Sequence, residues 1–211
     1  MGTTGLVSEL RRRWWLHAVA AVATLAVGFV LGDRSGDADQ ARPTFHDTQV
    51  IHPEDFQLLV TPEASEVVAL ARQLGTLEAA YGFVRDRIAF DPSVPAAEPR
   101  QTLREGRASC LGKATLLASL CRALGVPAGS VRVITGQVSI GDELYDHAWV
   151  DLEYGSLCLQ LDPTDLLGTH EFLQFPGNAY VRTFVSREMF CFNDEGFAVV
   201  SQLNRLKGRH P

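Results

Sequence analysis

The stretch SCLGKATLLASLCRALGVPA, residues 109–128, decides the fold of this chain. Its apolar residues recur every three or four positions, which predicts an α-helix from Cys110 to Leu124. Gly125 and Pro127 mark the end of that helix, because glycine ends helices readily and proline cannot continue one. The apolar stripe allows the helix to be held rigidly in a hydrophobic core.

Cys110 stands at the start of this predicted helix and directly follows Ser109. A thiol at a helix N-terminus feels the positive end of the helix dipole, which stabilises the thiolate form. The thiolate is the nucleophilic form of cysteine, so Cys110 is a candidate nucleophile.

Helical patterns precede this stretch and strand patterns follow it. Apolar residues at helical spacing predict helices over 62–74 and 77–88, followed by a loop that contains Pro95 and Pro99. Alternating patterns predict strands over 131–134, 145–152, 157–161, 189–192 and 197–201. Helices followed by strands predict an α+β fold with an antiparallel sheet.

The second and third strand patterns form a predicted hairpin with its turn at Tyr154-Gly155. If the loop is centred there, His147 and Asp162 lie directly opposite each other, with Cβ atoms about 4.5–5.5 Å apart. We expect the carboxylate to accept a hydrogen bond from Nδ1 of the imidazole, which leaves the other ring nitrogen free as a base. A slip of one residue would place the two side chains on opposite faces.

A thiolate at a helix tip, a histidine on a strand and an orienting aspartate form the layout of a cysteine acyl-transfer site. In this order the residues resemble the transglutaminase-like superfamily of papain-type cysteine enzymes. The resemblance rests on YGFVRDRIAFDP (81–92), the helix ending in LGVPA (124–128), HAWVD (147–151) and LDPT (161–164). It implies a papain-like core in which Cys110 is the nucleophile, His147 the general base and acid, and Asp162 the group that orients His147.

The chain departs from the family pattern in three places. Ala108 stands where the family often has glycine, and residues 157–159 are LCL where an aromatic residue often stands. A calcium-dependent periplasmic branch carries acidic residues after the cysteine, where this chain has LGK (111–113). The backbone amide of Cys110 is the default candidate for an oxyanion donor.

The remaining candidates have simpler interpretations. Trp149, on the His147 face of its strand, is expected to be a pocket wall or a core residue and is a weak candidate for contact with substrate. Cys121, Cys158 and Cys191 are expected to be packing residues, although a Cys158–Cys191 disulfide is possible in an oxidising compartment. No C-x-x-C or comparable ligand pair is present, so we expect no zinc site at the cysteines. We also expect no other metal and no cofactor.

The N-terminal part of the chain differs physically from the rest. Residues 14–32 contain no Asp, Glu, Lys or Arg, and as a helix they would span about 28 Å, close to the thickness of a bilayer core. Three arginines at 11–13 precede them, which predicts a cytoplasmic N-terminus and an extracytoplasmic domain. A cleaved signal peptide and a buried core helix are the alternatives. The predicted organisation is a cytoplasmic basic head (1–13), a transmembrane anchor (14–32), a tether and lead-in (33–60) and a transglutaminase-like domain (61–211).

Charge and length limit the function. The chain has 211 residues and a net charge of −6, and an acidic chain argues against nucleic-acid binding. The favoured function is a membrane-anchored thiol enzyme that acts on carboxamide or peptide carbonyls of a protein or peptide, by hydrolysis rather than amine cross-linking. The alternatives are a catalytically weak binding or assembly module at the membrane and, less favoured, acetyl transfer from coenzyme A.

Overall fold

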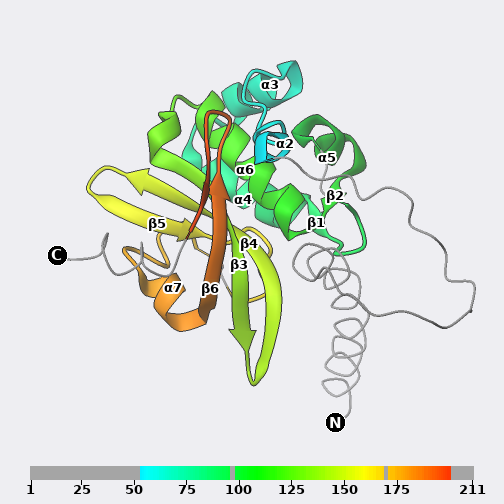
Figure 1. Ribbon diagram of the computed structural model, residues 1–211. Coiled ribbons are helices and arrows are strands. Elements are labelled where there is room, and N and C mark those ends of the chain that lie inside the picture. The colour runs from blue at the N-terminus through cyan, green and yellow to red at the C-terminus, as the bar shows by residue number, and fades with distance from the viewer. Residues whose placement is uncertain (1–52, 96–97, 169–170, 201–211) are drawn as a thin grey trace, which may run out of the picture.

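A five-stranded antiparallel sheet with helices on both sides forms the body of the protein (Figure 1). The computed structural model describes residues 53–95, 98–168 and 171–200. The helices are α2 (Pro53–Gln57), α3 (Ser65–Leu74), α4 (Leu77–Arg87), α5 (Pro99–Glu105), α6 (Cys110–Ala123), the 3-10 turn η2 (Ala128–Ser130) and α7 (Ala179–Phe184). The strands are β1 (Ala89–Phe90), β2 (Arg107–Ala108), β3 (Val131–Ile140), β4 (Glu143–Tyr154), β5 (Leu157–Leu161), β6 (Val185–Phe192) and β7 (Phe197–Val199). The predicted α+β class is confirmed.

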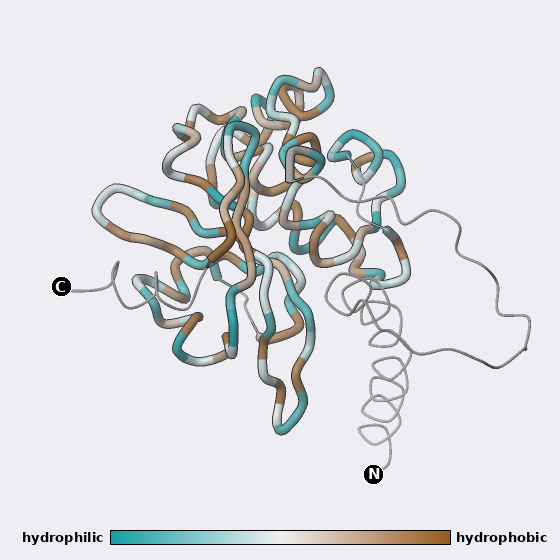
Figure 2. The backbone as a smooth tube through the Cα atoms, in the orientation of Figure 1, coloured by the Kyte–Doolittle hydropathy of each residue, from teal (hydrophilic) through white to brown (hydrophobic). Residues whose placement is uncertain are grey.

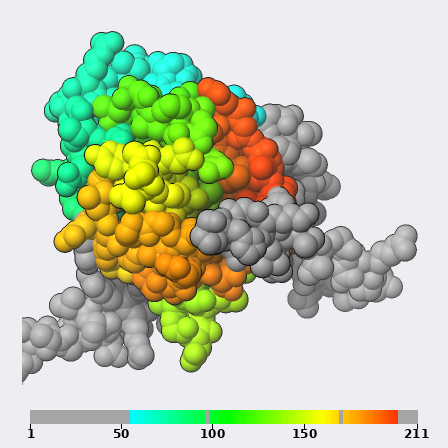
Figure 3. Space-filling view, turned by 90° about the vertical axis from the view of Figure 1, so that its left-hand side faces the viewer, coloured from blue at the N-terminus to red at the C-terminus, as the bar shows by residue number. Residues whose placement is uncertain are grey.

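The sheet has the strand order β5-β4-β3-β6-β7, and all of its pairs are antiparallel. A separate pair of short parallel strands, β1 and β2, joins the end of α4 to the residues just before Cys110. The sequence did not predict this pair, because two-residue strands carry too little periodicity to be detected. The β3–β4 hairpin projects from the body in two perpendicular views (Figures 1 and 3).

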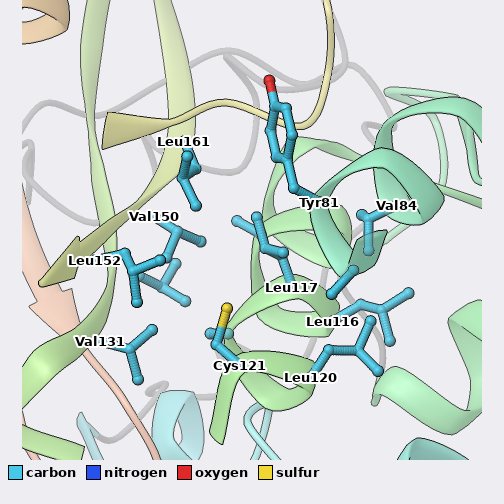
Figure 4. Packing of buried hydrophobic residues seen from close by; sticks show 14 of the residues in the cluster. Tyr81, Val84, Leu116, Leu117, Leu120, Cys121, Val131, Val150, Leu152 and Leu161 are labelled. Atoms are coloured by element: carbon cyan, nitrogen blue, oxygen red, sulfur yellow. The ribbon is translucent and has the colours of Figure 1, made fainter. Parts of the chain in front are cut away.

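Helix α6 occupies the centre of the larger core, as its apolar pattern predicts. Leu116, Leu117 and Leu120 are fully buried between α4 and the sheet residues Val150 and Leu152 (Figure 4). Each such burial contributes about 1.5–3 kcal/mol relative to an exposed side chain. The helix that carries Cys110 is therefore fixed in place by packing against both α4 and the sheet.

A second, smaller core lies on the α7 side of the sheet. It contains Trp149, Ile134 and Val138 from the strands together with Tyr180 and Val181 from α7. Because side chains alternate along a strand, β4 contributes Trp149 to this core and Ala148, Val150 and Leu152 to the core with α6. Hydrophilic residues are more frequent at the periphery, as the mainly teal α5 shows (Figure 2).

The structure corrects several predicted boundaries. The predicted loop around Pro99 contains α5, which has proline in its first turn and ends at Gly106 with φ 64°. Part of the predicted lead-in is folded, because Phe56 of α2 packs against Phe190 and Val60 is 2% exposed. The first and fourth predicted strands are longer than expected, since β3 extends to Ile140 and β6 begins at Val185.

The predicted anchor over 14–32 lies outside the described residues. Among the residues that the structure does describe, no helix combines the length and the hydropathy needed to cross a bilayer.

Candidate active site

Cys110 is the first residue of α6, as predicted. Ser109 is the N-cap residue, and its hydroxyl accepts a hydrogen bond from the amide of Gly112 at 3.5 Å. Cys110 is 8% exposed, so only a small part of it is accessible. A Cβ atom on Gly112 would lie 2.9 Å from the Cβ of Ala108, so the glycine permits close packing of the first turn of α6 against β2.

The hairpin that carries His147 and Asp162 has a different register from the predicted one. Its two-residue turn is Gly155-Ser156, with Gly155 at φ 62°, so that Val150 pairs with Leu161. Asp162 directly follows β5 and is two positions short of the point opposite His147. Because the difference is an even number of residues, the two side chains still share one face of the sheet.

His147 and Asp162 are in direct contact. The distance from His147 Nε2 to Asp162 Oδ2 is 2.9 Å, and their side chains are 4% and 0% exposed. The expectation that Nδ1 binds the carboxylate was therefore wrong, because the diagonal offset of the two residues presents Nε2 to Asp162. The nitrogen left free is Nδ1, and the Cys110 side chain interacts with this histidine.

The early end of β5 leaves space for the helix tip to approach the histidine. Pairing of β4 with β5 covers only Val150–Tyr154 of β4. Within the described part of the chain, no strand pairs on that side with the segment of β4 that contains His147. The structure thus brings Cys110, His147 and Asp162 together, although they come from a helix, a strand and the end of a strand.

Four hydrogen bonds hold the Asp162 carboxylate. Thr164 donates to Oδ1 through its amide at 3.0 Å and its hydroxyl at 2.6 Å. Tyr180 of α7 donates to Oδ2 at 3.1 Å, beside the bond from His147. Burial acts to raise the pKa of Asp162, but the charge and hydrogen bond of His147 and the bonds from Thr164 lower it below its usual value.

The aspartate keeps His147 positively charged. Burial acts to lower the pKa of His147, but the charge and hydrogen bond of Asp162, together with the interaction with Cys110, raise it to about 10. Burial and the charge of Asp162 also raise the pKa of Tyr180, so its hydroxyl stays protonated as a donor. At neutral pH the site therefore contains an imidazolium that faces a carboxylate.

Sequence reasoning missed two of these supporting residues. Thr164 could have been found, because Asp-Pro-Thr is a sequence in which the aspartate accepts bonds from the residue two positions later. Tyr180 could not, because it lies on the six-residue α7, which no periodic pattern predicts.

Trp149 and the other cysteines lie away from the accessible part of the site. Trp149 is 0% exposed and packs on Tyr180 with a ring-centroid distance of 5.5 Å, so it is a core residue in this structure. Burial raises the pKa of Cys121 to about 12. Cys158 and Cys191 form no disulfide and lie on β5 and β6, three strand spacings or about 14 Å apart, too far for the disulfide considered from the sequence.

Metal ligands do not cluster around this site. The described residues contain no group of three or more His, Cys, Asp or Glu side chains that could hold a metal ion.

A family comparison agrees with this geometry. The model of the transglutaminase-like superfamily matches residues 64–159, a span that includes Cys110 and His147. Residues 64–159 are therefore similar to the transglutaminase-like superfamily. The transglutaminase-like segment thus extends from just before α3 into β5, and Asp162 lies just beyond its end.

Solved structures with similar folds include a candidate cysteine protease from Cytophaga hutchinsonii, with 17% identity and a TM-score of 0.44 over 76% of this chain and 56% of that one. The chain therefore spans little more than half of that protein. LapG of Legionella pneumophila has 16% identity and a TM-score of 0.47 over 74% of this chain and 92% of that one. Its calcium-bound form has 17% identity and a TM-score of 0.46 over 64% and 75% of the two chains. No curated protein sequence matches the chain.

Proposed function

We propose that this protein is a membrane-anchored, extracytoplasmic thiol hydrolase that cleaves carboxamide or peptide bonds through a Cys110 thioester. The observation that carries the proposal is the 2.9 Å contact between His147 Nε2 and Asp162 Oδ2, with the Cys110 side chain interacting with the same imidazole. A nucleophile, a base and an orienting carboxylate in this order are the three parts that thiol acyl transfer requires.

The first half-reaction forms the acyl-enzyme. The Cys110 thiolate attacks the carbonyl carbon of the substrate, a carbon–sulfur bond forms, and the carbonyl electron pair moves onto the oxygen. The backbone amide of Cys110, at the positive end of α6, is the proposed donor to that oxyanion. The imidazolium of His147 then gives its proton to the leaving nitrogen as the carbon–nitrogen bond breaks.

The second half-reaction releases the product. Water attacks the thioester carbonyl, and His147, now neutral, takes a proton from that water. The carbon–sulfur bond breaks, a carboxylic acid leaves, and the Cys110 thiolate and the imidazolium are restored. Asp162 keeps the ring oriented and stabilises its charge in both steps. An amine in place of water would give cross-linking, and we favour water because it is abundant outside the cytoplasm.

Selective alkylation tests the proposal without knowledge of the substrate. At pH 6.5 we expect iodoacetamide to modify Cys110 faster than the other cysteines, because the proposed reaction requires a nucleophilic sulfur beside the His147 imidazole. Cys158 is the internal control, since it is partly exposed and lies away from the imidazole. Replacement of His147 by Gln should slow modification of Cys110 at least tenfold and leave Cys158 unchanged. Equal labelling of the two cysteines in the unmodified chain would contradict the proposal.

The near burial of the site favours a second candidate function, a binding or assembly module with little catalytic activity. Cys110 is 8% and His147 6% exposed, so a substrate carbonyl has only a narrow approach. The two functions differ in the fate of a bound peptide. With a thiol hydrolase, any peptide that the chain cleaves survives intact when Cys110 is replaced by Ala; a binding module would capture peptides without cleavage in both forms.

A further inference from the structure

Lys113 is an amine buried close to the candidate site. It lies about one helical turn after Cys110 on α6, and it is 1% exposed. A buried ammonium costs free energy unless its hydrogens are bonded, and a methionine would fill a similar space without that cost. Packing alone therefore does not account for a lysine at this position.

The Lys113 amine bonds to the carboxyl end of α4. Its Nζ donates to the carbonyl oxygen of Ile88 at 2.7 Å and to that of Arg85 at 3.1 Å. No carboxylate of the described residues forms an ion pair with it. The last carbonyls of a helix lack partners within the helix and carry the negative end of its dipole, so they suit an ammonium. Lys113 thus ties the first turn of α6 to α4.

The same helix also holds Asp162. Tyr81 of α4 is 2% exposed, and its hydroxyl donates to the backbone carbonyl of Asp162 at 3.2 Å. In Figure 4 this hydroxyl points away from the leucines of α6. One helix is therefore bonded through Lys113 to the turn that carries Cys110 and through Tyr81 to the residue that binds His147.

We propose that Lys113 is a positioning residue, which together with Tyr81 uses α4 as a rigid connection to fix the distance between Cys110 and the His147–Asp162 pair. This inference rests on the proposed function, because it concerns the same thiol. Burial lowers the pKa of Lys113 to about 8, while Asp162, Asp165 and Asp86 act to raise it and Arg85 acts to lower it. At pH 7 the amine is therefore still mostly protonated, and the test belongs at that pH.

The experiment measures the rate at which iodoacetamide modifies Cys110 in the whole chain that carries Lys113→Met. This substitution keeps the approximate size of the side chain and removes its hydrogen-bond donors. We expect iodoacetamide to modify Cys110 at least tenfold more slowly at pH 7. We also expect the pKa of His147, followed by NMR, to fall by at least one unit as its partners move away. Tyr81→Phe should also slow the modification of Cys110, by about threefold. The double variant should be slower than Lys113→Met by less than that factor, because both bonds serve one connection.

Leu120→Ala is the matched control. It lies on the same helix, is 0% exposed, and has no bond to either carbonyl. Under conditions where every variant is folded, it should change the rate less than twofold. Equal slowing in Lys113→Met and Leu120→Ala, or an unchanged rate and an unchanged His147 pKa in Lys113→Met, would overturn the inference. If Lys113→Met does not fold, the inference is tested with Tyr81→Phe alone, by the alkylation rate of Cys110 and the pKa of His147. Absence of preferential labelling of Cys110 in the unmodified chain would instead overturn the proposed function.

Discussion

At the scale of single residues, the site depends on one buried charge pair. His147 and Asp162 are almost completely buried, and each stabilises the charged form of the other. Removal of one partner leaves the other as an uncompensated group in a medium that penalises charge. Mutation of either residue should therefore change the protonation of its partner first.

Asp162→Asn should lower the pKa of His147 from about 10 to below its ordinary value near 6.5, because burial then acts without the opposing carboxylate. An NMR titration of the imidazole measures this shift. Asp165→Asn is the control, since Asp165 is exposed and follows the same turn, and it should leave the titration almost unchanged. A His147 pKa that stays near 10 in Asp162→Asn would contradict the assigned cause.

The same charge makes stability depend on pH. The pKa of His147 is raised in the folded state, so its contribution is full below the unfolded value near 6.5 and is lost as pH rises through about 10. The difference in unfolding free energy between the natural chain and His147→Gln should therefore shrink over this range by a few kcal/mol, at about 1.4 kcal/mol per pKa unit. Urea unfolding at pH 6.5 and pH 10 measures it. A difference that does not change with pH would show that His147 is not charged in the folded protein.

At the scale of the element, two glycines allow the backbone to approach closely beside the site. Gly136 of β3 pairs with His147, and a Cβ atom there would lie 2.2 Å from the carbonyl oxygen of Arg187 on β6. This is where β3 and β6 shift register. Gly112 likewise allows the first turn of α6 to approach Ala108 of β2 closely.

Gly136→Ala should destabilise the fold by about 3 kcal/mol, since a backbone oxygen cannot move aside as a flexible side chain can. Chemical denaturation measures the loss. Gly82→Ala in α4 is the control: its Cβ would meet nothing within 4 Å, and alanine in a helix should stabilise by up to about 1 kcal/mol. Similar effects at both positions would contradict the steric argument.

Gly112→Ala should destabilise by about 1–3 kcal/mol, because its new Cβ would meet that of Ala108 at 2.9 Å. Removing the obstructing methyl group with Ala108→Gly in the same chain should restore at least half of the loss. Unfolding of both single variants and the double variant measures the coupling. If the losses in unfolding free energy of the two single variants simply added in the double variant, the new Cβ at residue 112 would not be in conflict with the Cβ of Ala108.

The elements also show what a sequence can predict. The boundaries of α6 and β5 agree with the periodic patterns to within a residue, because both are long or regular enough to bury one set of side chains. The sequence singled out Cys110, His147 and Asp162 as candidates, and the structure places their side chains close together. It missed the register by two residues, since both Tyr154-Gly155 and Gly155-Ser156 are reasonable turns. It missed α5, α7 and β1–β2, because short elements are determined by tertiary contacts.

At the scale of the whole molecule, charge divides the chain. Residues 1–32 carry a net charge of +2 and the remainder −8, with the apolar run 14–32 in the first part. This division is the basis of the proposed anchor, which lies outside the described residues.

The full-length chain should stay with the membrane after extraction with alkaline carbonate. Val22→Arg combined with Leu25→Arg should release it, because each arginine at the centre of a span costs about 2.5–3.5 kcal/mol. Val67→Ala, a change within the described domain, is the control and should not release the chain. Release of the unmodified chain would contradict the anchor.

The early end of β5 also bears on how this protein can tolerate insertions and deletions. One extra residue within Leu157–Leu161 would turn the Asp162 side chain to the other face, and two would keep the face but move it about 7 Å along the strand. One extra residue would therefore separate the carboxylate from the imidazole, while two would bring Asp162 opposite His147 but lengthen β5 along the part of β4 beside which Cys110 lies. The length of this five-residue strand is therefore as restricted as the identity of the aspartate that follows it, and in evolution we expect the adjacent turn, rather than the strand, to change in length.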